Sequence, residues 1–302
     1  MTVAPEPARP EEWPAAFRLL FRPLPAEVRE QRVSTALALL EQGELMPDGI
    51  LVLRDGGEVA GVLACMPLPG ATALVWPPQW RDGPEDVSGE DRLVRHAVRW
   101  LRGRGVKLVQ SLFPPDGVAA SASLERNGFV HVTHLWYLRH TLGSLPPDAG
   151  VPGRLDFVTV EDAPEQLAET LIRSYEGTLD CPEISGVRTV EEVLDGHRSQ
   201  GRHDPRRWWL ATDAGQAVGV ALVSLTPETD EWDVMYVGVV PEARRRGFGR
   251  ELMLKVLVEA AAAGVPGVTL SVDGRNDPAW HLYRALGFEP FDRREVFLAI
   301  LR

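Results

Sequence analysis

The chain has 302 residues, of which 44% are hydrophobic and 25% charged, and its formal net charge is −11. This length exceeds the size at which one hydrophobic core usually stops growing, so two domains are expected. The negative charge argues against nucleic acid or a membrane surface as the main partner, because a phosphate-rich partner requires a basic face. An acidic protein suits a small cationic substrate better.

The N-terminus and the cysteines favour a cytoplasmic protein. The first residues, MTVAPEPARPEEW, lack the basic and apolar regions of a signal peptide, and no apolar run is long enough to span a bilayer. Cys65 and Cys181 form neither a disulfide framework nor a zinc-binding pattern. We therefore expect no metal and no membrane partner, and a monomer or a homodimer.

Two segments of the chain end alike. Gly128-Phe129 and Gly287-Phe288 lie 159 residues apart, and the same offset relates Leu93 to Leu252. Self-similarity at a fixed period indicates two copies of one fold. We place the first copy at 1–140 and the second at 154–302, joined by the Pro/Gly-rich linker 141–153.

Both copies show the same order of elements: helices, then strands, a helix, a strand, and a closing helix and strand. The second copy predicts helices at 163–175, 190–199, 246–263 and 278–286, and strands at 207–212, 217–224, 233–240, 269–272 and 294–300. This order predicts an α/β (α+β) fold in which each copy is a mixed, mostly antiparallel sheet flanked by helices.

One turn of the second copy has the features of a phosphate site. The strand that ends at Val240 runs through Pro241 into a turn with Gly247 and Gly249, and then into a helix. The N-terminus of a helix offers free N–H groups and a positive dipole end, and glycines let the backbone approach an anion. Four arginines add positive charge there: Arg244, Arg245, Arg246 and Arg250.

This turn resembles the pyrophosphate loop of the GNAT superfamily of acyl-CoA-dependent N-acyltransferases. Its signature, [RQ]-x-x-G-x-[GA], is matched by Arg244, Gly247 and Gly249. The superfamily also places an Asn before a helix with a Tyr and a following Gly-Phe, as in Asn276, Tyr283 and Gly287-Phe288. The resemblance implies acetyl-CoA as donor, with these cofactor-binding residues: Val237, Gly238, Val239, Arg244, Arg245, Arg246, Gly247, Phe248, Gly249, Arg250 and Asn276.

The resemblance also implies a general base and a general acid. Many members place a Glu eleven positions before the signature; that position is Asp233 here, with Glu231 as its nearest competitor. A regular strand would put Asp233 on the same face as Val237 and Val239. Asp233 would deprotonate the amine, and Tyr283 would protonate the CoA thiolate. The alternatives are that Asp233 is a solvated residue at the start of the strand and that Tyr283 is an aromatic residue of the core.

The linker between the first two helices of the second copy lines the acceptor pocket in many superfamily members. Its acids Glu176, Asp180 and Glu183 would bind a cationic amine, unless they form a solvated loop. We therefore expect an N-acetyltransferase that acts on a primary amine of a small molecule, with peptide N-termini a weaker candidate. A non-catalytic acyl-CoA-binding sensor is the alternative.

The first copy lacks these features. At the positions of Arg244, Gly247, Gly249 and Tyr283 it carries Glu85, Ser88, Glu90 and Leu124. Acidic side chains at that position would repel a pyrophosphate. Among tandem superfamily members the C-terminal copy can be the catalytic one, and we expect one CoA site per chain.

Overall fold

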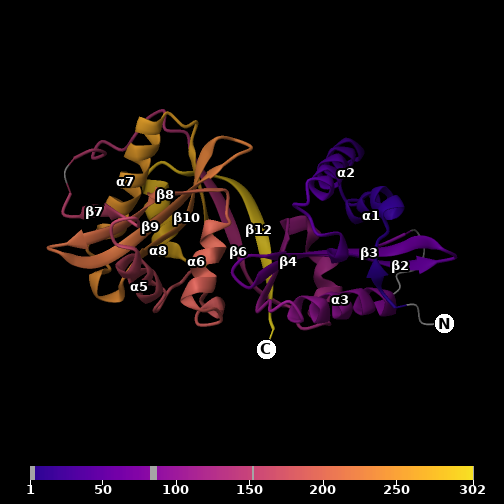
Figure 1. Ribbon diagram of the computed structural model, residues 1–302. Helices are drawn as coiled ribbons and strands as arrows, with labels where there is room; N and C mark the ends of the chain where they lie inside the picture. Colours follow the sequence, from indigo (N-terminus) through magenta and orange to yellow (C-terminus); the bar gives the residue numbers. More distant parts are fainter. Residues whose placement is uncertain (1–3, 82–86, 152, 302) are drawn as a thin grey trace. The chain divides into compact units, whose positions relative to one another are not determined.

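The computed structural model describes residues 4–81, 87–151 and 153–301 (Figure 1). The chain forms two compact units, Met1–Val132 with Glu295–Arg302, and Thr133–Arg294. Each unit contains a mixed sheet with helices, so the predicted fold class is confirmed. Throughout these described ranges, every helix is too short or too polar to cross a membrane.

The first unit has the strand order β1-β2-β3-β4-β5-β12, antiparallel except between β4 and β5. This unit has two apolar cores. One contains residues of α3, and the other contains residues of α1 and α2. Its elements are β1 (Glu6–Pro7), α1 (Trp13–Leu20), α2 (Ala26–Glu41), β2 (Ile50–Asp55), β3 (Glu58–Leu68), β4 (Thr72–Trp80), α3 (Val87–Arg102), β5 (Leu108–Phe113) and α4 (Ala122–Glu125).

The second unit has the order β6-β11-β10-β9-β8-β7, again with one parallel pair, β10 with β11. Its elements are β6 (Val130–His140), β7 (Asp156–Thr159), α5 (Pro164–Ser174), α6 (Val190–Arg198), β8 (Arg202–Asp213), β9 (Gln216–Thr226), β10 (Glu231–Val239), α7 (Phe248–Ala263), β11 (Val268–Asp273), α8 (Asp277–Ala285) and β12 (Glu289–Ile300).

The two halves of the sequence exchange their closing strands. β6 follows the first half's α4 but pairs with β11, with Leu135 opposite Asp273. β12 follows α8 but pairs with β5, with Glu295 opposite Phe113. The predicted division at 1–140, 141–153 and 154–302 follows the duplication of the sequence, whereas each compact unit includes a strand from the other half.

The two faces of the second sheet are covered by different helices. Leu252, Val256 and Ala260 of α7 are fully buried in one core. Leu167 of α5 and Val193 of α6 belong to the core on the other face, and Figure 1 shows α7 and the pair α5 and α6 on opposite sides of β8–β10. Both cores hold the central strands in place.

Glycines define both ends of α7. The helix was expected from residue 246, but it begins at Phe248 because Gly247 has a φ of 88°, outside the helical region. Gly264, with a φ of 71°, ends the helix in the left-handed conformation that glycine favours there. The pyrophosphate-type turn is therefore longer, and its helix shorter, than the sequence pattern predicts.

Candidate active site

The central feature of the second unit is the separation of two neighbouring strands. β10 pairs with β11 at Trp232, Asp233 and Val234. On its other edge β10 continues to pair with β9 as far as Val239. Past Val234, within the described residues, the β11 edge of β10 has no strand partner, so backbone groups there are available to a ligand that enters beside the strand.

A β-bulge at Met235 changes which side chains share a face of β10. The register with β9 shifts between Val234 and Tyr236. Val237 and Val239 therefore pack with the α7 core, which also contains Val234. The expectation that Asp233 shares their face is wrong, because the extra residue reverses the alternation of side chains. Asp233 lies instead on the side of α5 and α6.

The turn after β10 presents backbone donors. It consists of the short 3-10 helix η5 (Pro241–Ala243) and the residues up to Gly247, the N-cap of α7. Among the described residues, no backbone oxygen accepts the N–H groups from Arg245 to Gly249. A Cβ on Gly247 would meet no atom within 4 Å, so its φ of 88° is what requires glycine. These residues fit a pyrophosphate at the start of a 16-residue helix.

The arginines around this turn differ in their partners. Arg246 donates to Asp213 at 2.5 Å, and Arg250 holds Asp148 through two hydrogen bonds of 2.7 and 2.8 Å. Arg245 is exposed and has an unusual φ of 64°. Within the described part of the chain Arg245 forms no ion pair, so its charge is the most available to an anion.

Arg244 lies in a different environment from the one expected of a phosphate ligand. Its guanidinium donates to three backbone oxygens at the end of α5 and beyond: Ser174 at 3.0 Å, Glu176 at 2.6 Å and Gly177 at 3.2 Å. Its Nε donates to Val239 O at 3.0 Å. Arg244 thus joins the end of β10 to the loop 175–183 that follows α5.

Asp233 is held at the point where the strands separate. Its Oδ1 accepts a hydrogen bond from Thr269 Oγ1 at 2.9 Å. Burial raises the pKa of the Asp233 carboxyl, and the Thr269 hydrogen bond partly opposes that shift. Its competitor Glu231 is buried in an ion pair with Arg139. Among the residues that the structure describes, Asp233 is therefore the carboxylate of β10 without a cationic partner.

Asn276 and Tyr283 both belong to α8, Asn276 as its N-cap and Tyr283 two turns further along. Asn276 caps this helix, and its side-chain oxygen accepts from the N–H of Ala279 at 3.3 Å. Tyr283 is 8% exposed and packs against Phe288 with ring centroids 5.9 Å apart. Burial raises the pKa of the Tyr283 hydroxyl, so it stays protonated at neutral pH. A protonated phenol can donate.

The three acids of the loop 175–183 differ in their environments. Glu176 is exposed. Glu183 is engaged by Arg275 through hydrogen bonds of 2.6 and 3.0 Å. Burial, and then the charge of Asp273, raise the pKa of Asp180 to about 6. Asp180 is thus the acid whose charge changes near neutral pH.

Asp273, at the end of β11, is a residue that the sequence analysis missed. It is fully buried and accepts from Thr133 at 2.5 Å, from the Cys181 N–H at 2.9 Å and from Arg275. These contacts lower its pKa to about 2 against the effect of burial. Ligand atoms of Asp180, Cys181 and Asp273 lie within 4.8 Å of one another. No motif marks Asp273, because two of its partners, Thr133 and Cys181, lie far away in the sequence.

A cluster of aromatic hydroxyl groups was also missed. Tyr236 OH and Ser174 Oγ are 2.9 Å apart, and Tyr175 OH lies 3.1 Å from His197 Nε2. The rings of Tyr175 and Tyr236 meet edge to face at 4.9 Å. A Cβ on Gly238 would lie 2.5 Å from Ser174 Oγ, so glycine is required beside this cluster. Three elements contribute to it, α5 with its C-cap, α6 and β10, which leaves no local sequence signal.

In the first unit, the corresponding positions differ as the sequence implies. Leu124 is fully buried, without a hydroxyl group to donate. Glu90, in the first turn of α3, pairs with Arg126 at 3.0 Å. Glu85 lies outside the described residues. A carboxylate in the first turn of α3 disfavours an anion there.

Sequence comparisons agree with this geometry. The model of the acetyltransferase (GNAT) family matches residues 169–288. A protein named mycothiol acetyltransferase from Thermobispora bispora is 32% identical over 86% of each chain. One of the same name from Thermomonospora curvata is 30% identical over 68% of this chain and 72% of its own. From Asp233 to Phe288 the chain also resembles mycothiol synthase, a tandem enzyme.

Solved structures share the whole architecture. A GCN5-related N-acetyltransferase from Sphaerobacter thermophilus has a TM-score of 0.64 at 22% identity and covers 99% of this chain and 95% of its own. A tandem GNAT protein from the clavulanic acid biosynthesis pathway has a TM-score of 0.53 at 19% identity, over 98% and 97%. At these identities the likeness concerns the fold.

Proposed function

Because this chain belongs to the GNAT family of acetyltransferases, we propose that its second half transfers an acetyl group from acetyl-CoA to a small-molecule primary amine. One observation carries this proposal: β10 leaves β11 directly after Asp233 and Val234, and leads into a turn of free N–H groups. This arrangement offers an edge of strand for the pantetheine arm and a helix N-terminus for the pyrophosphate.

Asp233 would act as the general base. An alkylammonium has a reference pKa of about 10.4, so it must lose a proton before it attacks the thioester. Asp233 lies where the strands part, and burial raises the pKa of its carboxyl toward that of a useful base. The proton would pass to Asp233 directly or through one water.

The oxyanion and the leaving group need separate donors. Backbone N–H groups of Val237–Val239 lie on β10 beyond its pairing with β11, where they could stabilise the tetrahedral oxyanion. Tyr283 would donate its phenolic proton to the CoA thiolate, since its raised pKa keeps it protonated. Asn276 would contact the pantetheine arm in addition to capping α8.

The acceptor would lie under the loop that precedes η4 (Pro182–Ile184). Arg244 fixes the start of this loop, and Arg275 fixes its end through Glu183. Asp180 lies between these two attachments and is the acid best placed to bind an ammonium group. The name of the relatives makes a mycothiol-type amine the first acceptor to test, followed by other small amines and a peptide N-terminus.

The deciding experiment combines calorimetric titration of acetyl-CoA with an acetylation assay. The wild type should bind one acetyl-CoA per chain and acetylate at least one amine of the panel. The variant Gly247→Glu, Gly249→Glu places two carboxylates at the pyrophosphate turn, and it should lose both binding and activity. Ser88→Glu in the first half is the matched control and should change neither.

The outcomes separate the alternatives. Binding without acetylation of any amine would favour an acyl-CoA sensor over an enzyme. Two acetyl-CoA molecules per chain would show that the first half also binds the cofactor. Absence of binding to the wild type would contradict the proposed function.

A further inference from the structure

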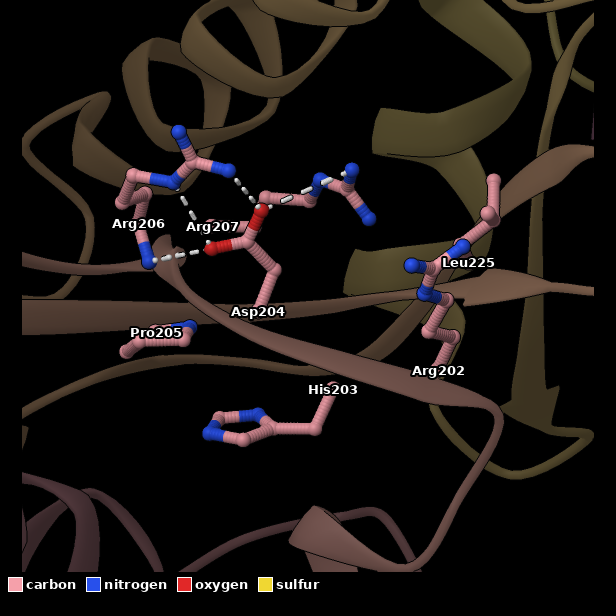
Figure 2. A pocket seen from close by; sticks show the side chains of 7 residues that line it. All are labelled: Arg202, His203, Asp204, Pro205, Arg206, Arg207 and Leu225. Atoms are coloured by element: carbon pink, nitrogen blue, oxygen red, sulfur yellow. Dashed lines mark hydrogen bonds and ion pairs between the residues drawn. The ribbon is translucent and has the colours of Figure 1, made fainter.

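The second unit contains a hollow that the proposed reaction does not use. It has a volume of about 380 Å³ and is lined by residues of β8 and by Leu225 of β9 (Figure 2). β8 advances five residues, from His203 to Trp208, while β9 advances two, from Ser224 to Leu222. The additional residues leave the regular ladder and form the wall of the hollow. They are Asp204, Pro205, Arg206 and Arg207.

The lining is basic in a chain whose net charge is −11. It contains Arg202, Arg206 and Arg207, against one carboxylate, Asp204. Burial lowers the pKa of His203, and the charge of Arg198 lowers it further, so this ring is neutral at pH 7. The side chains that line the hollow therefore carry a net charge of two positive units.

Asp204 is already occupied by one of these arginines. Arg206 donates to it from its backbone N–H and its Nε, both at 3.0 Å, and from Nη2 at 2.8 Å. Arg206 thereby lowers the pKa of Asp204 and keeps it ionised. Arg207 reaches the same carboxylate at 3.6 Å, too far for a strong hydrogen bond. Figure 2 shows Asp204 between the two, with Arg202 beyond Arg207.

One buried nitrogen atom of the arginines at this hollow, Arg207 Nη1, has no hydrogen-bond partner among the described residues. A buried polar atom without a partner is uncommon and destabilising. Arg202 likewise forms no ion pair within the described part of the chain. The guanidinium of Arg207 is nevertheless held in place, because it stacks over the ring of Trp232 at 5.1 Å.

We propose that this hollow binds a small oxyanion, a phosphate or a carboxylate, between Arg202 and Arg207. A guanidinium binds such groups through two parallel hydrogen bonds, and a second arginine adds charge from another side. The donors on Arg207 without a partner are of the kind that an oxyanion satisfies.

The hollow is separate from the pyrophosphate turn. Its Leu225 pairs with Trp232, near the start of β10, whereas the turn follows Val239 at the end of that strand. At about 3.3 Å per residue the two ends are roughly 20 Å apart. A single acetyl-CoA pyrophosphate therefore does not account for both sites, and the binding can be measured without acetyl-CoA or an amine.

The test uses the full chain in which Gly247→Glu and Gly249→Glu block the pyrophosphate turn. Inorganic phosphate and succinate are titrated separately by calorimetry, with sodium chloride at equal ionic strength as the reference. One saturable site is expected for at least one of the two anions. The additional changes Arg202→Gln and Arg207→Gln should weaken that site roughly tenfold or more, because each removes charge-assisted hydrogen bonds.

The matched control removes two exposed arginines elsewhere, Arg32→Gln and Arg102→Gln, and should leave affinity unchanged. If Arg207→Gln disturbs folding through Trp232, then Arg202→Gln alone decides, since the described residues give its side chain no polar contact. The proposal would be overturned if Arg202→Gln left the affinity for the anion unchanged. It would also be overturned if the heats of phosphate and succinate binding were no larger than those of sodium chloride.

Acetylation assays and anion titrations on the wild type, whose pyrophosphate turn is intact, distinguish two sources of the anion. If it is a group on the acceptor, phosphate or succinate will compete with that acceptor in the acetylation assay and raise its KM. If it is a separate effector, it will bind with the same affinity whether or not the acceptor is present. Both results support the site, and they assign it differently.

Discussion

The Nη2 of Arg244 donates to the backbone oxygen of Glu176 at 2.6 Å, so the first residue of the pyrophosphate-loop signature holds the loop proposed to cover the acceptor. The same guanidinium reaches Ser174 O and Gly177 O. A side chain with these partners stabilises the loop proposed to cover the acceptor, whereas the backbone N–H groups that follow it form the proposed pyrophosphate turn.

Arg244→Gln should therefore raise the KM for the amine more than the Kd for acetyl-CoA. Loss of three hydrogen bonds to backbone oxygens loosens the loop, and we expect roughly a tenfold or larger rise in KM. Steady-state kinetics measure the KM for the amine, and calorimetry measures the Kd for acetyl-CoA. Arg245→Gln is the comparison, because its exposed charge should affect acetyl-CoA binding instead. If Arg244→Gln weakens acetyl-CoA and leaves the amine KM unchanged, Arg244 is a cofactor ligand.

Thr269→Val should shift the acidic limb of the pH profile of kcat/KM to higher pH. Burial raises the pKa of Asp233, and the hydroxyl of Thr269 opposes this by donating to the ionised carboxylate. Without that donor the carboxylate takes up its proton at a higher pH, so the base is lost earlier as the solution is acidified. Asp233→Asn should abolish this limb and lower kcat strongly. An unchanged limb in Thr269→Val would remove Asp233 as the titrating base.

Tyr283→Phe should lower kcat by roughly ten- to a thousandfold while the Kd for acetyl-CoA stays nearly constant. Phenylalanine keeps the ring that packs on Phe288, so a folding defect is not expected. Phe288→Leu is the packing control and should lower thermal stability more than kcat. A Tyr283→Phe enzyme with wild-type kcat would leave Tyr283 as a core residue.

Features that depend on residues close together in the sequence could be predicted, whereas features that depend on residues far apart in the sequence could not. Local patterns predicted the Gly247 turn, the helix that follows it and the position of Asn276 before a helix, since residues close together in the sequence determine them. The bulge at Met235 could not be predicted, because it depends on the register between β10 and β9. Neither could the strand exchange of β6 and β12, which depends on partners more than a hundred residues away.

The same reasoning explains the residues of the site whose contacts the sequence did not predict. Arg244 matches the signature in type and position, but its contacts come from the end of α5. Asp273 and its partner Thr133 are 140 positions apart. Nothing in the sequence distinguishes Asp180 from Glu183, since both are acids of one loop. In the structure Glu183 forms an ion pair with Arg275, whereas Asp180 lies next to the carboxylate of Asp273.

Asp180→Asn should stabilise the protein at pH 8 and do so progressively less as the pH falls to 4.5. In the folded state burial and the charge of Asp273 raise the pKa of Asp180 to about 6, against about 3.9 in an unfolded chain. The unfolded state therefore loses this proton first as the pH rises, so folding stability decreases through this range and the full penalty is present above pH 6. The neutral side chain of asparagine removes this loss of stability.

The expected gain at pH 8 is about 1–3 kcal/mol in the free energy of unfolding. Denaturant titrations of both proteins at the two pH values measure it, with Glu176→Gln as the control because Glu176 is exposed. If the gain is the same at both pH values, Asp180 does not titrate in this range. A gain at pH 8 together with a higher KM for the amine would show that Asp180 is kept, at a cost in stability, to bind the acceptor.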